Sequence, residues 1–272
     1  MASKFALCIG INNYPGTNSD LAGCVNDAND WTALLTSLGF ITKKLLDRQA
    51  TKATILSEMT NIVSQAQKGD SIVFQYSGHG TFIPDEDGDE ADQTDECLCP
   101  YDLRTKGVIT DDQLFQLFNK KATGVRLVMI SDSCHSGTVS RFVPTTSSSS
   151  ARGRKEEKTK VKFLPPASFL SARELAKLGI SRAVRSSSPP GRYGGLLMSG
   201  CQDVEYSYDA YFQGRPNGAF TYAAIKTFKK LKPGASYKDW HTAIRKALPT
   251  AQYPQSPNLF GSTTMKKWKA LQ

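Results

Sequence analysis

Two short motifs contain the residue types of a nucleophilic site. Residues 77–80 (SGHG) place His79 between two glycines, and residues 132–137 (DSCHSG) place Cys134 55 residues further along the chain. A thiolate is the nucleophilic form of cysteine, and a nearby imidazole favours its formation and can later protonate a leaving amine. Flanking glycines leave backbone N–H groups accessible to a developing oxyanion. The pair therefore predicts covalent catalysis by Cys134 with His79 as its acid–base partner.

A metal or redox site is the alternative chemistry for these residue types. Cys97 and Cys99 are separated by one residue, which is closer than in the usual zinc-binding pairs, and no set of cysteines and histidines completes a tetrahedral site. The chain opens directly on a strand-like segment and shows no secretion signal, so we expect the six cysteines to be free thiols in a reducing compartment.

Alternating strand-like and helix-like segments must position the two motifs. Short apolar runs predict strands over 5–11, 40–46, 71–76, 126–131, 195–200 and 257–260. Apolar residues at helical spacing predict helices over 21–38, 51–67, 111–118, 218–230 and 237–248. This alternation predicts an α/β fold with a mostly parallel central sheet sandwiched by helices. His79 and Cys134 each follow a strand, so both should lie at the carboxyl edge of that sheet.

The positive charge is concentrated in one segment. The 272 residues include 34 basic and 25 acidic ones, for a formal net charge of +9. Residues 141–192 hold 12 of the basic and 3 of the acidic residues, which leaves 22 of each elsewhere. Serine runs and proline pairs in the same segment indicate an exposed, mobile insert. A nucleic-acid partner is disfavoured because no aromatic residues interleave with the charges, and no apolar stretch approaches the ~20 residues of a membrane span.

The motifs resemble those of the metacaspases, which are caspase-like cysteine peptidases with the caspase–haemoglobinase fold. The matching segments are FALCIGINNY, LAGCVNDA, YSGHG, ITDDQL, ISDSCHSG and LLMSGCQD, spread over residues 5–141 and 194–259. The resemblance implies a catalytic dyad of His79 and Cys134. It also implies an oxyanion hole formed by the backbone N–H groups of Gly80 and Cys134.

The same resemblance implies cleavage after Arg or Lys. Metacaspases bind the P1 side chain in an acidic S1 pocket, and the matching positions here are Cys24, Asp27, Ser77 and Asp132. Two carboxylates suit a guanidinium or ammonium group, and bidentate pairing favours Arg geometrically. From the residues alone, Asp27 could equally be a residue on a helix face and Asp132 a turn former.

An acidic segment, residues 85–96 (DEDGDEADQTDE), suggests a cation. It fails as an EF-hand loop because its sixth position is Glu90 instead of glycine and no helix obviously precedes it. Metacaspases, however, often bind an activating Ca²⁺, and the resemblance implies Asp95, Asp111 and Asp112 as its ligands here. Arg141 stands where some members carry a further acidic ligand, which predicts a weaker site or one completed by water or carbonyl groups. A solvated acidic loop is the alternative.

The resemblance also divides the chain and gives the basic insert a role. We expect a large catalytic subdomain (1–140), a linker (141–193) and a small subdomain (194–272). In this family the linker can be cut autocatalytically after basic residues. The candidate cleavage positions are Arg152, Arg154, Lys155, Lys158, Lys160, Arg182 and Arg185. As a hypothesis, the uncut linker covers the active site; a passive linker is the alternative.

The predicted function is therefore a calcium-activated cysteine endopeptidase that cleaves protein substrates after Arg or Lys. The expected molecule is a monomer in the cytoplasm, with the nucleus as the alternative location. Two other functions stay open. One is a peptidase of the same fold with another P1 preference, such as asparaginyl or separase-like. The other is a catalytically silent, calcium-dependent interaction protein.

Overall fold

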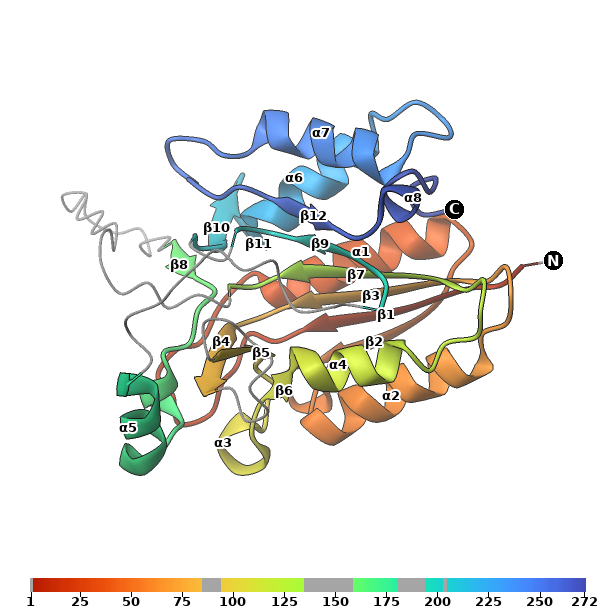
Figure 1. Ribbon diagram of the computed structural model, residues 1–272. Helices are drawn as coiled ribbons and strands as arrows, with labels where there is room; N and C mark the ends of the chain where they lie inside the picture. Colours follow the sequence, from red (N-terminus) through yellow and green to blue (C-terminus); the bar gives the residue numbers. More distant parts are fainter. Residues whose placement is uncertain (1, 85–93, 135–158, 181–193, 203–204) are drawn as a thin grey trace.

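The computed structural model describes residues 2–84, 94–134, 159–180, 194–202 and 205–272. Its centre is a six-stranded sheet in the order β12-β9-β7-β3-β1-β2 (Figure 1). Five strands are parallel and the edge strand β12 is antiparallel. The strands are β1 (Lys4–Gly10), β2 (Ile41–Leu46), β3 (Ser71–Ser77), β7 (Arg126–Asp132), β9 (Leu196–Ser199) and β12 (Asn258–Phe260). The predicted α/β class with a mostly parallel sheet is confirmed.

Helices cover both faces of this sheet. The inner strands β1, β3, β7 and β9 are buried on both sides because they are apolar runs whose side chains alternate between the two faces. In β1, Leu7 and Ile9 face one cluster of buried residues, and Ala6 and Cys8 face the other. Helices α2 (Lys52–Gln65) and α4 (Asp111–Phe118) pack on the first face. Helices α1 (Cys24–Ser37), α6 (Ala219–Phe228) and α7 (Tyr237–Ala247) pack on the second, as Figure 1 shows.

Two small sheets lie beside the carboxyl ends of the central strands (Figure 1). One has the order β4-β5-β6 and the other β11-β10-β8. Their bounds are β4 (Gly80–Pro84), β5 (Thr94–Leu98), β6 (Ile109–Thr110), β8 (Lys160–Val161), β10 (Tyr208–Phe212) and β11 (Arg215–Gly218). The short helices are α3 (Leu103–Lys106), α5 (Ala172–Ile180) and α8 (Thr263–Lys266), with 3₁₀ turns at Asp47–Gln49 and Pro166–Ser168. The small sheets build the surroundings of the site.

The expectation of a wholly exposed insert is wrong for part of residues 141–193. Lys160 and Val161 form β8, which pairs with Tyr208 and Asp209 of β10. Leu164 is completely buried in the core cluster that also contains α2 and α4. The physical reason is the apolar content of the segment VKFL, which buries its side chains despite the surrounding charges. The predicted limits of the two subdomains remain a prediction.

Candidate active site

His79 lies in the turn between β3 and β4. Its backbone N–H donates to the Tyr14 hydroxyl at 2.7 Å, and the two rings lie 4.6 Å apart. Gly78 precedes it because a Cβ there would collide with the hydroxyl groups of Tyr14 and Tyr76. The Nε2 atom of His79 lies 2.6 Å from the Ser19 carbonyl oxygen. Since a carbonyl only accepts, Nε2 carries the proton and Nδ1 is left as the basic nitrogen.

The environment keeps this imidazole neutral. Burial lowers the pKa of His79 from 6.5 to about 4, although the backbone carbonyls of Ser19 and Lys162 both oppose the shift. Nδ1 is buried and has no hydrogen-bond partner among the residues that the structure describes. A neutral ring with an available Nδ1 can accept a proton from a thiol.

Cys134 lies two residues beyond the end of β7 and is completely buried. The Ser207 N–H donates to its Sγ, and the Sγ–H donates to the Ser207 carbonyl at 3.4 Å. Strands β3 and β7 pair with Ser77 opposite Asp132. The turns that carry His79 and Cys134 therefore leave neighbouring strands at the same level, as expected for this edge of the sheet.

One carbonyl group links the two turns. The Lys162 carbonyl oxygen accepts the N–H of Gly80 at 3.0 Å and the N–H of Cys134 at 3.2 Å. These two N–H groups are the ones expected to form an oxyanion hole. They converge on a peptide carbonyl, which is the group that an acyl-transfer site must polarise. The carbonyl comes from the basic insert of the chain itself.

The Lys162 side chain enters a buried acidic pocket. Its Nζ lies 2.8 Å from Ser77 Oγ, 3.1 Å from Asp27 Oδ2 and 3.2 Å from Asp132 Oδ2. The side chains of Lys162 and Asp27 are 0% exposed and that of Asp132 is 1% exposed, so the charges meet in a region that excludes water. Three of the four expected S1 residues thus contact one basic side chain.

Each carboxylate is also held by the protein. Asp132 accepts the Ser207 hydroxyl at 2.6 Å and, from Thr221, the N–H at 3.0 Å and the hydroxyl at 2.8 Å. Asp27 accepts the Ser77 hydroxyl at 2.6 Å, the Gly218 N–H at 2.9 Å and the Asn217 amide at 3.0 Å. Hydrogen bonds of this kind fix the direction of a buried charge and reduce the cost of burying it.

Gly218 leaves the room for the basic side chain. A Cβ at this position would collide with Asp132 Oδ2, Lys162 Nζ and Asp27 Oδ2. Its backbone is extended, with φ −67° and ψ 135°, which any residue can adopt. The glycine is therefore required by the close approach of the three charged groups and not by its backbone conformation.

The charges in the pocket shift one another's pKa. Burial alone would lower the pKa of Lys162, but the Asp132 and Asp27 carboxylates outweigh it and hold this pKa well above its usual value. Burial raises the pKa of Asp27, and the nearby Lys162 charge opposes that shift. Cys24, the fourth expected residue, is completely buried beside this group, and burial raises the pKa of its thiol.

The segment around Lys162 lies in the site as an extended peptide. Before Lys162, β8 pairs antiparallel with β10, and the Lys162 N–H donates to the Ser207 carbonyl at 2.9 Å. After Lys162, the Leu164 N–H donates to the Gly80 carbonyl at 2.9 Å, and Thr81 Oγ1 donates to the Leu164 carbonyl at 2.7 Å. Main-chain pairing on both sides is the geometry in which a strand-like ligand is bound at a sheet edge.

The expected calcium ligands are only partly brought together. Asp95 in β5 and Asp111 at the start of α4 are each 5% exposed. The pKa of the buried Cys97 thiol is raised mainly by burial, and the negative charges of Asp95 and Asp111 add to that shift. Asp112 is partly buried in the first turn of the same helix. Among the described residues, no three acidic, Cys or His side chains converge on one point. Residues 85–93 and Arg141 lie outside the described part of the chain.

Most of the expected cleavage positions also lie outside the described residues. These are Arg152, Arg154, Lys155, Lys158, Arg182 and Arg185. Lys160 is described, and its exposed Nζ donates to the Asp20 carbonyl. It lies two residues before the carbonyl that the Gly80 and Cys134 N–H groups bind.

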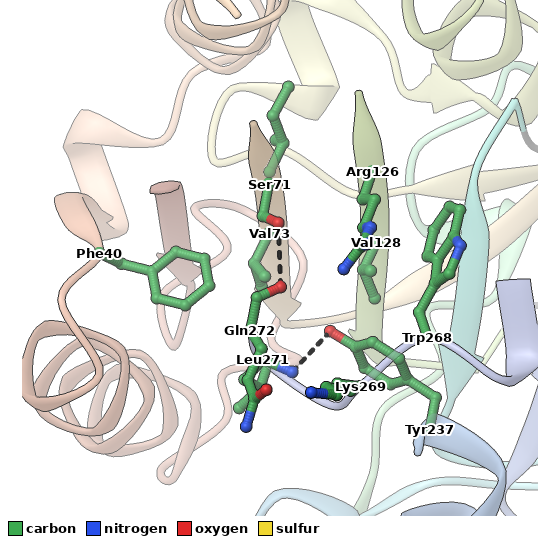
Figure 2. A pocket seen from close by; sticks show the side chains of 11 residues that line it. Phe40, Ser71, Val73, Arg126, Val128, Tyr237, Trp268, Lys269, Leu271 and Gln272 are labelled. Atoms are coloured by element: carbon green, nitrogen blue, oxygen red, sulfur yellow. Dashed lines mark hydrogen bonds between the residues drawn. The ribbon is translucent and has the colours of Figure 1, made fainter. Parts of the chain in front are cut away.

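A small pocket at the other end of the sheet contains none of these groups (Figure 2). It surrounds Ser71 and Arg126, which begin β3 and β7, about 20 Å along the strands from the site. The Ser71 hydroxyl donates to the Gln272 carbonyl at 3.0 Å, and the Leu271 N–H donates to the Tyr237 hydroxyl at 3.2 Å. The side chains that line the pocket include no Cys, His, Asp or Glu, so it has neither a thiol nor an imidazole to pair as in the site.

All six cysteines are free and buried, as the expectation of free thiols requires. In the described part of the chain, no helix has the length and apolar character needed to cross a membrane.

Comparisons with known proteins identify the family. A family model described as the caspase domain matches residues 3–268. The crystal structure of protein GSU0716 from Geobacter sulfurreducens has a TM-score of 0.72 at 28% identity, covering 99% of this chain and 98% of that one. The chain therefore belongs to the caspase-domain family.

Curated relatives narrow the class. Identity is 34% to metacaspase-1 of Emericella nidulans, covering 94% of this chain and 70% of that protein. It is 33% to metacaspase-1B of Aspergillus oryzae (93% and 66%) and 33% to metacaspase-1 of Cryptococcus neoformans (96% and 63%). Within the caspase-domain family the chain is thus a metacaspase. It spans somewhat less than two thirds of the length of the last two relatives.

The sequence did not predict several residues of the site. Lys162 is the most important, and Ser207, Asn217 and Gly218 complete its surroundings. The apolar stretch VKFL inside the basic insert was an available signal, because an alternating run of this kind favours a strand. The other three residues follow a long connection and had no local pattern that linked them to the site.

Proposed function

We propose that this chain is a cysteine endopeptidase that cleaves after Lys or Arg. The observation that supports this most is the placement of Lys162, whose side chain reaches Asp27 and Asp132 while its carbonyl accepts the Gly80 and Cys134 N–H groups. A P1 residue must satisfy both conditions at once. A P1 Asp would bring a third carboxylate into the pocket, which like-charge repulsion disfavours.

The proposed chemical steps give each of these groups a role. His79 Nδ1 takes the thiol proton, and the Cys134 thiolate attacks the P1 carbonyl carbon, whose oxygen is stabilised by the Gly80 and Cys134 N–H groups. The C–N bond breaks as His79 returns the proton to the leaving amine. Water then hydrolyses the thioester, releasing the P1 carboxylate and the free thiol.

We further propose that Lys162–Phe163 is the bond that the enzyme cuts in its own chain, in place of the cleavage positions expected from the sequence. In the arrangement described above, the Cys134 thiol donates its hydrogen to the Ser207 carbonyl. Attack requires the thiol to turn toward His79 first. The docked segment thus represents the uncut enzyme, with its own lysine in the position of a substrate.

Calcium is proposed as the trigger. Asp95 and Asp111 are buried carboxylates that both lie close enough to Cys97 to raise its pKa, and carboxylates suit a hard cation with oxygen ligands. Ca²⁺ takes six to eight such ligands, so Asp95, Asp111 and Asp112 would supply only part of the set. When bound, the ion would supply charge neutralisation. Asp95 lies opposite Ile83 in the β4–β5 pair, and β4 begins at Gly80, so a shift there would reach the N–H that binds the Lys162 carbonyl.

The test uses fluorogenic peptides with Arg, Lys, Asp or Asn at P1, with and without millimolar Ca²⁺, and Cys134→Ala as the blank. We expect cleavage after Arg and Lys only, and only with Ca²⁺. Cleavage after Asp or Asn would overturn the specificity while sparing the nucleophile. No labelling of Cys134 by a thiol-directed peptide probe would favour the silent interaction protein.

Self-cleavage is tested by sequencing the fragments formed after Ca²⁺ addition. A new N-terminus at Phe163 is expected for the wild-type chain, and none for Cys134→Ala or Lys162→Ala. A new N-terminus elsewhere in the insert would show that the docked bond is not the one that is cut.

A further inference from the structure

The residue after Lys162 occupies a second site, which is apolar. Consecutive side chains of an extended peptide point to opposite sides, so the Phe163 side chain leaves the backbone away from the acidic pocket. It is 8% exposed. Its ring stacks on that of Phe82, with centroids 6.1 Å apart and planes at 16°. On another side lies Tyr206, with centroids 6.3 Å apart and planes at 50°.

The walls of this site come from elements that are already fixed by the fold. Phe82 is two residues after Gly80 in β4, so its position is set by the same strand whose first N–H binds the Lys162 carbonyl. Tyr206 precedes Ser207, whose carbonyl accepts the Lys162 N–H. The sulfur-bearing side chains of Cys134 and Cys201 complete the apolar cluster around the ring.

The backbone of Phe163 is held in register by its neighbours. Phe163 itself forms a parallel bridge with Gly80, and the hydrogen bonds of Leu164 to Gly80 and Thr81 fix the chain beyond it. These contacts involve main-chain groups or a side-chain hydroxyl bound to a carbonyl, so any extended peptide can make them. The rings around Phe163 are therefore what can distinguish one side chain from another at this position.

We propose that Phe82 and Tyr206 form an S1′ subsite that selects an aromatic residue immediately after the cleaved bond. Its ligand class is a peptide in which a basic residue is followed by Phe or Tyr. Stacked and tilted rings at these separations attract one another beyond the apolar area that they bury. A negatively charged P1′ residue would lose its hydration against the rings without gaining a partner from them. The inference rests on the proposed Lys/Arg endopeptidase function.

The experiment compares quenched peptides Gly-Val-Lys-X-Leu, where X is Phe, Tyr, Ala or Glu, with the Ca²⁺-treated full chain. Mass spectrometry locates the cut bond, and the measured quantity is the ratio of kcat/KM for X = Phe to that for X = Ala. We expect a ratio of about ten for the wild-type chain, as for other apolar subsites that gain one side chain. Glu should be the poorest of the four.

Variants of the two rings test the assignment. Phe82→Ala and Tyr206→Ala should each bring the Phe/Ala ratio toward one, whereas Tyr206→Phe, which keeps the ring, should retain it. Tyr222→Ala is the matched control. It removes a ring that stacks on Phe212, with centroids 4.0 Å apart, outside the docked segment, and it should leave the ratio at its wild-type value. Phe82→Leu replaces Phe82→Ala if the latter does not fold.

The outcomes separate this inference from the function on which it rests. Equal rates for X = Phe and X = Ala, with both peptides cut after Lys, would overturn the S1′ subsite and leave the proposed function intact. A ratio that survives in both alanine variants would also overturn it, because the preference would then come from elsewhere. No cut after Lys in any peptide would overturn the proposed function, and the subsite with it.

Discussion

The two sides of the docked bond are recognised by different forces. Lys162 is bound through charge, since its ammonium lies among groups that are almost completely buried. Phe163 is bound through ring contacts in a small buried apolar cluster. Removing the partner of a buried charge costs several kcal/mol. Removing one side of an apolar contact costs free energy in proportion to the apolar area that is exposed.

This difference follows from the origin of each side. The acidic pocket draws on α1, β3, β7 and the β11–α6 junction, so its groups come together only when the whole sheet edge is formed. The apolar side depends mainly on β4 and the residues before β10. We therefore expect substitutions on the charged side to affect folding and cleavage together, and those on the apolar side to change preference with little effect on folding.

The largest effect is expected from Asp132→Ala. This change removes one of the two carboxylates that hold Lys162 and leaves the Thr221 N–H without its acceptor. The free energy of unfolding should fall by about 3–5 kcal/mol, as for other broken buried ion pairs, and cleavage after Lys should be lost. Urea unfolding and the peptide assay measure the two effects.

Asp30→Ala is the matched control for this prediction. Asp30 pairs with Arg215 at 2.6 Å, but both side chains are partly exposed, at 35% and 47%. Its loss should cost at most about 1 kcal/mol. Similar losses for the two variants would contradict the contrast between a buried and an exposed pair.

The free energy of unfolding should depend on pH because of the shifted pKa of His79. Its pKa is about 4 in the folded chain, against an ordinary value of 6.5. Between these values the unfolded chain binds a proton that the folded chain does not, so the contribution of His79 to stability is fully present above pH 6.5 and lost as the pH falls toward 4. The total change is up to about 3 kcal/mol. Between pH 4.5 and 7.5, the free energy of unfolding should therefore rise more steeply with pH for the wild-type chain than for His79→Gln. Urea unfolding at a series of pH values measures it.

Asp209 provides a control of opposite sign. It accepts the N–H groups of Ala22 and Gly23, and burial raises its pKa from 3.8 to about 6. The contribution of Asp209 to stability is present below pH 3.8 and is lost as the pH rises through 6. Asp209→Asn should make the rise of stability with pH steeper between pH 4 and 6. Identical curves for both variants and wild type would contradict the assignment of either group.

Much of the fold was predictable because its signal is local. The runs that form β1, β3 and β7 are apolar and short, and each predicted central strand and helix is found within a few residues of its expected bounds. His79 and Cys134 were predictable as a pair, since parallel topology alone places both turns at one sheet edge. The small sheets containing β4 and β10 were not predicted, because their strands are short and partly polar.

The remaining part of the site depends on contacts distant in the sequence. Lys162 lies 135 residues from Asp27 along the chain, and no periodicity in either segment connects them. Its charge also suggested an exposed position, because a lysine is buried only where partners compensate it. Only the assembled sheet edge, with Asp27 and Asp132 both directed at one point, makes burial of Lys162 favourable.

A smaller loss is expected from Gly218→Ala. The added methyl group would meet the carboxylates and the ammonium in the pocket, although the backbone accepts alanine without strain. Overpacking of this size costs about 1–3 kcal/mol, so kcat/KM for peptides with P1 Lys should fall about ten- to hundredfold. Far-UV circular dichroism should remain unchanged, which separates a blocked pocket from an unfolded chain. An unaltered kcat/KM would show that P1 binds elsewhere.

The smallest effect is expected from Lys160→Ala, on the same side of the bond as Lys162 but without its partners. The Lys160 side chain is exposed, and its Nζ donates to the Asp20 carbonyl. Its loss should change stability by less than about 0.5 kcal/mol and leave the new N-terminus at Phe163, whereas Lys162→Ala should abolish that fragment. Lys160 is the third residue before the proposed cut. If Lys160→Ala instead removed the fragment, self-cleavage would depend on this position, and binding of Lys162 by the buried carboxylates would not be enough to direct it. The charge that matters is thus the one buried between two carboxylates, which Lys162 has and Lys160, two residues earlier, does not.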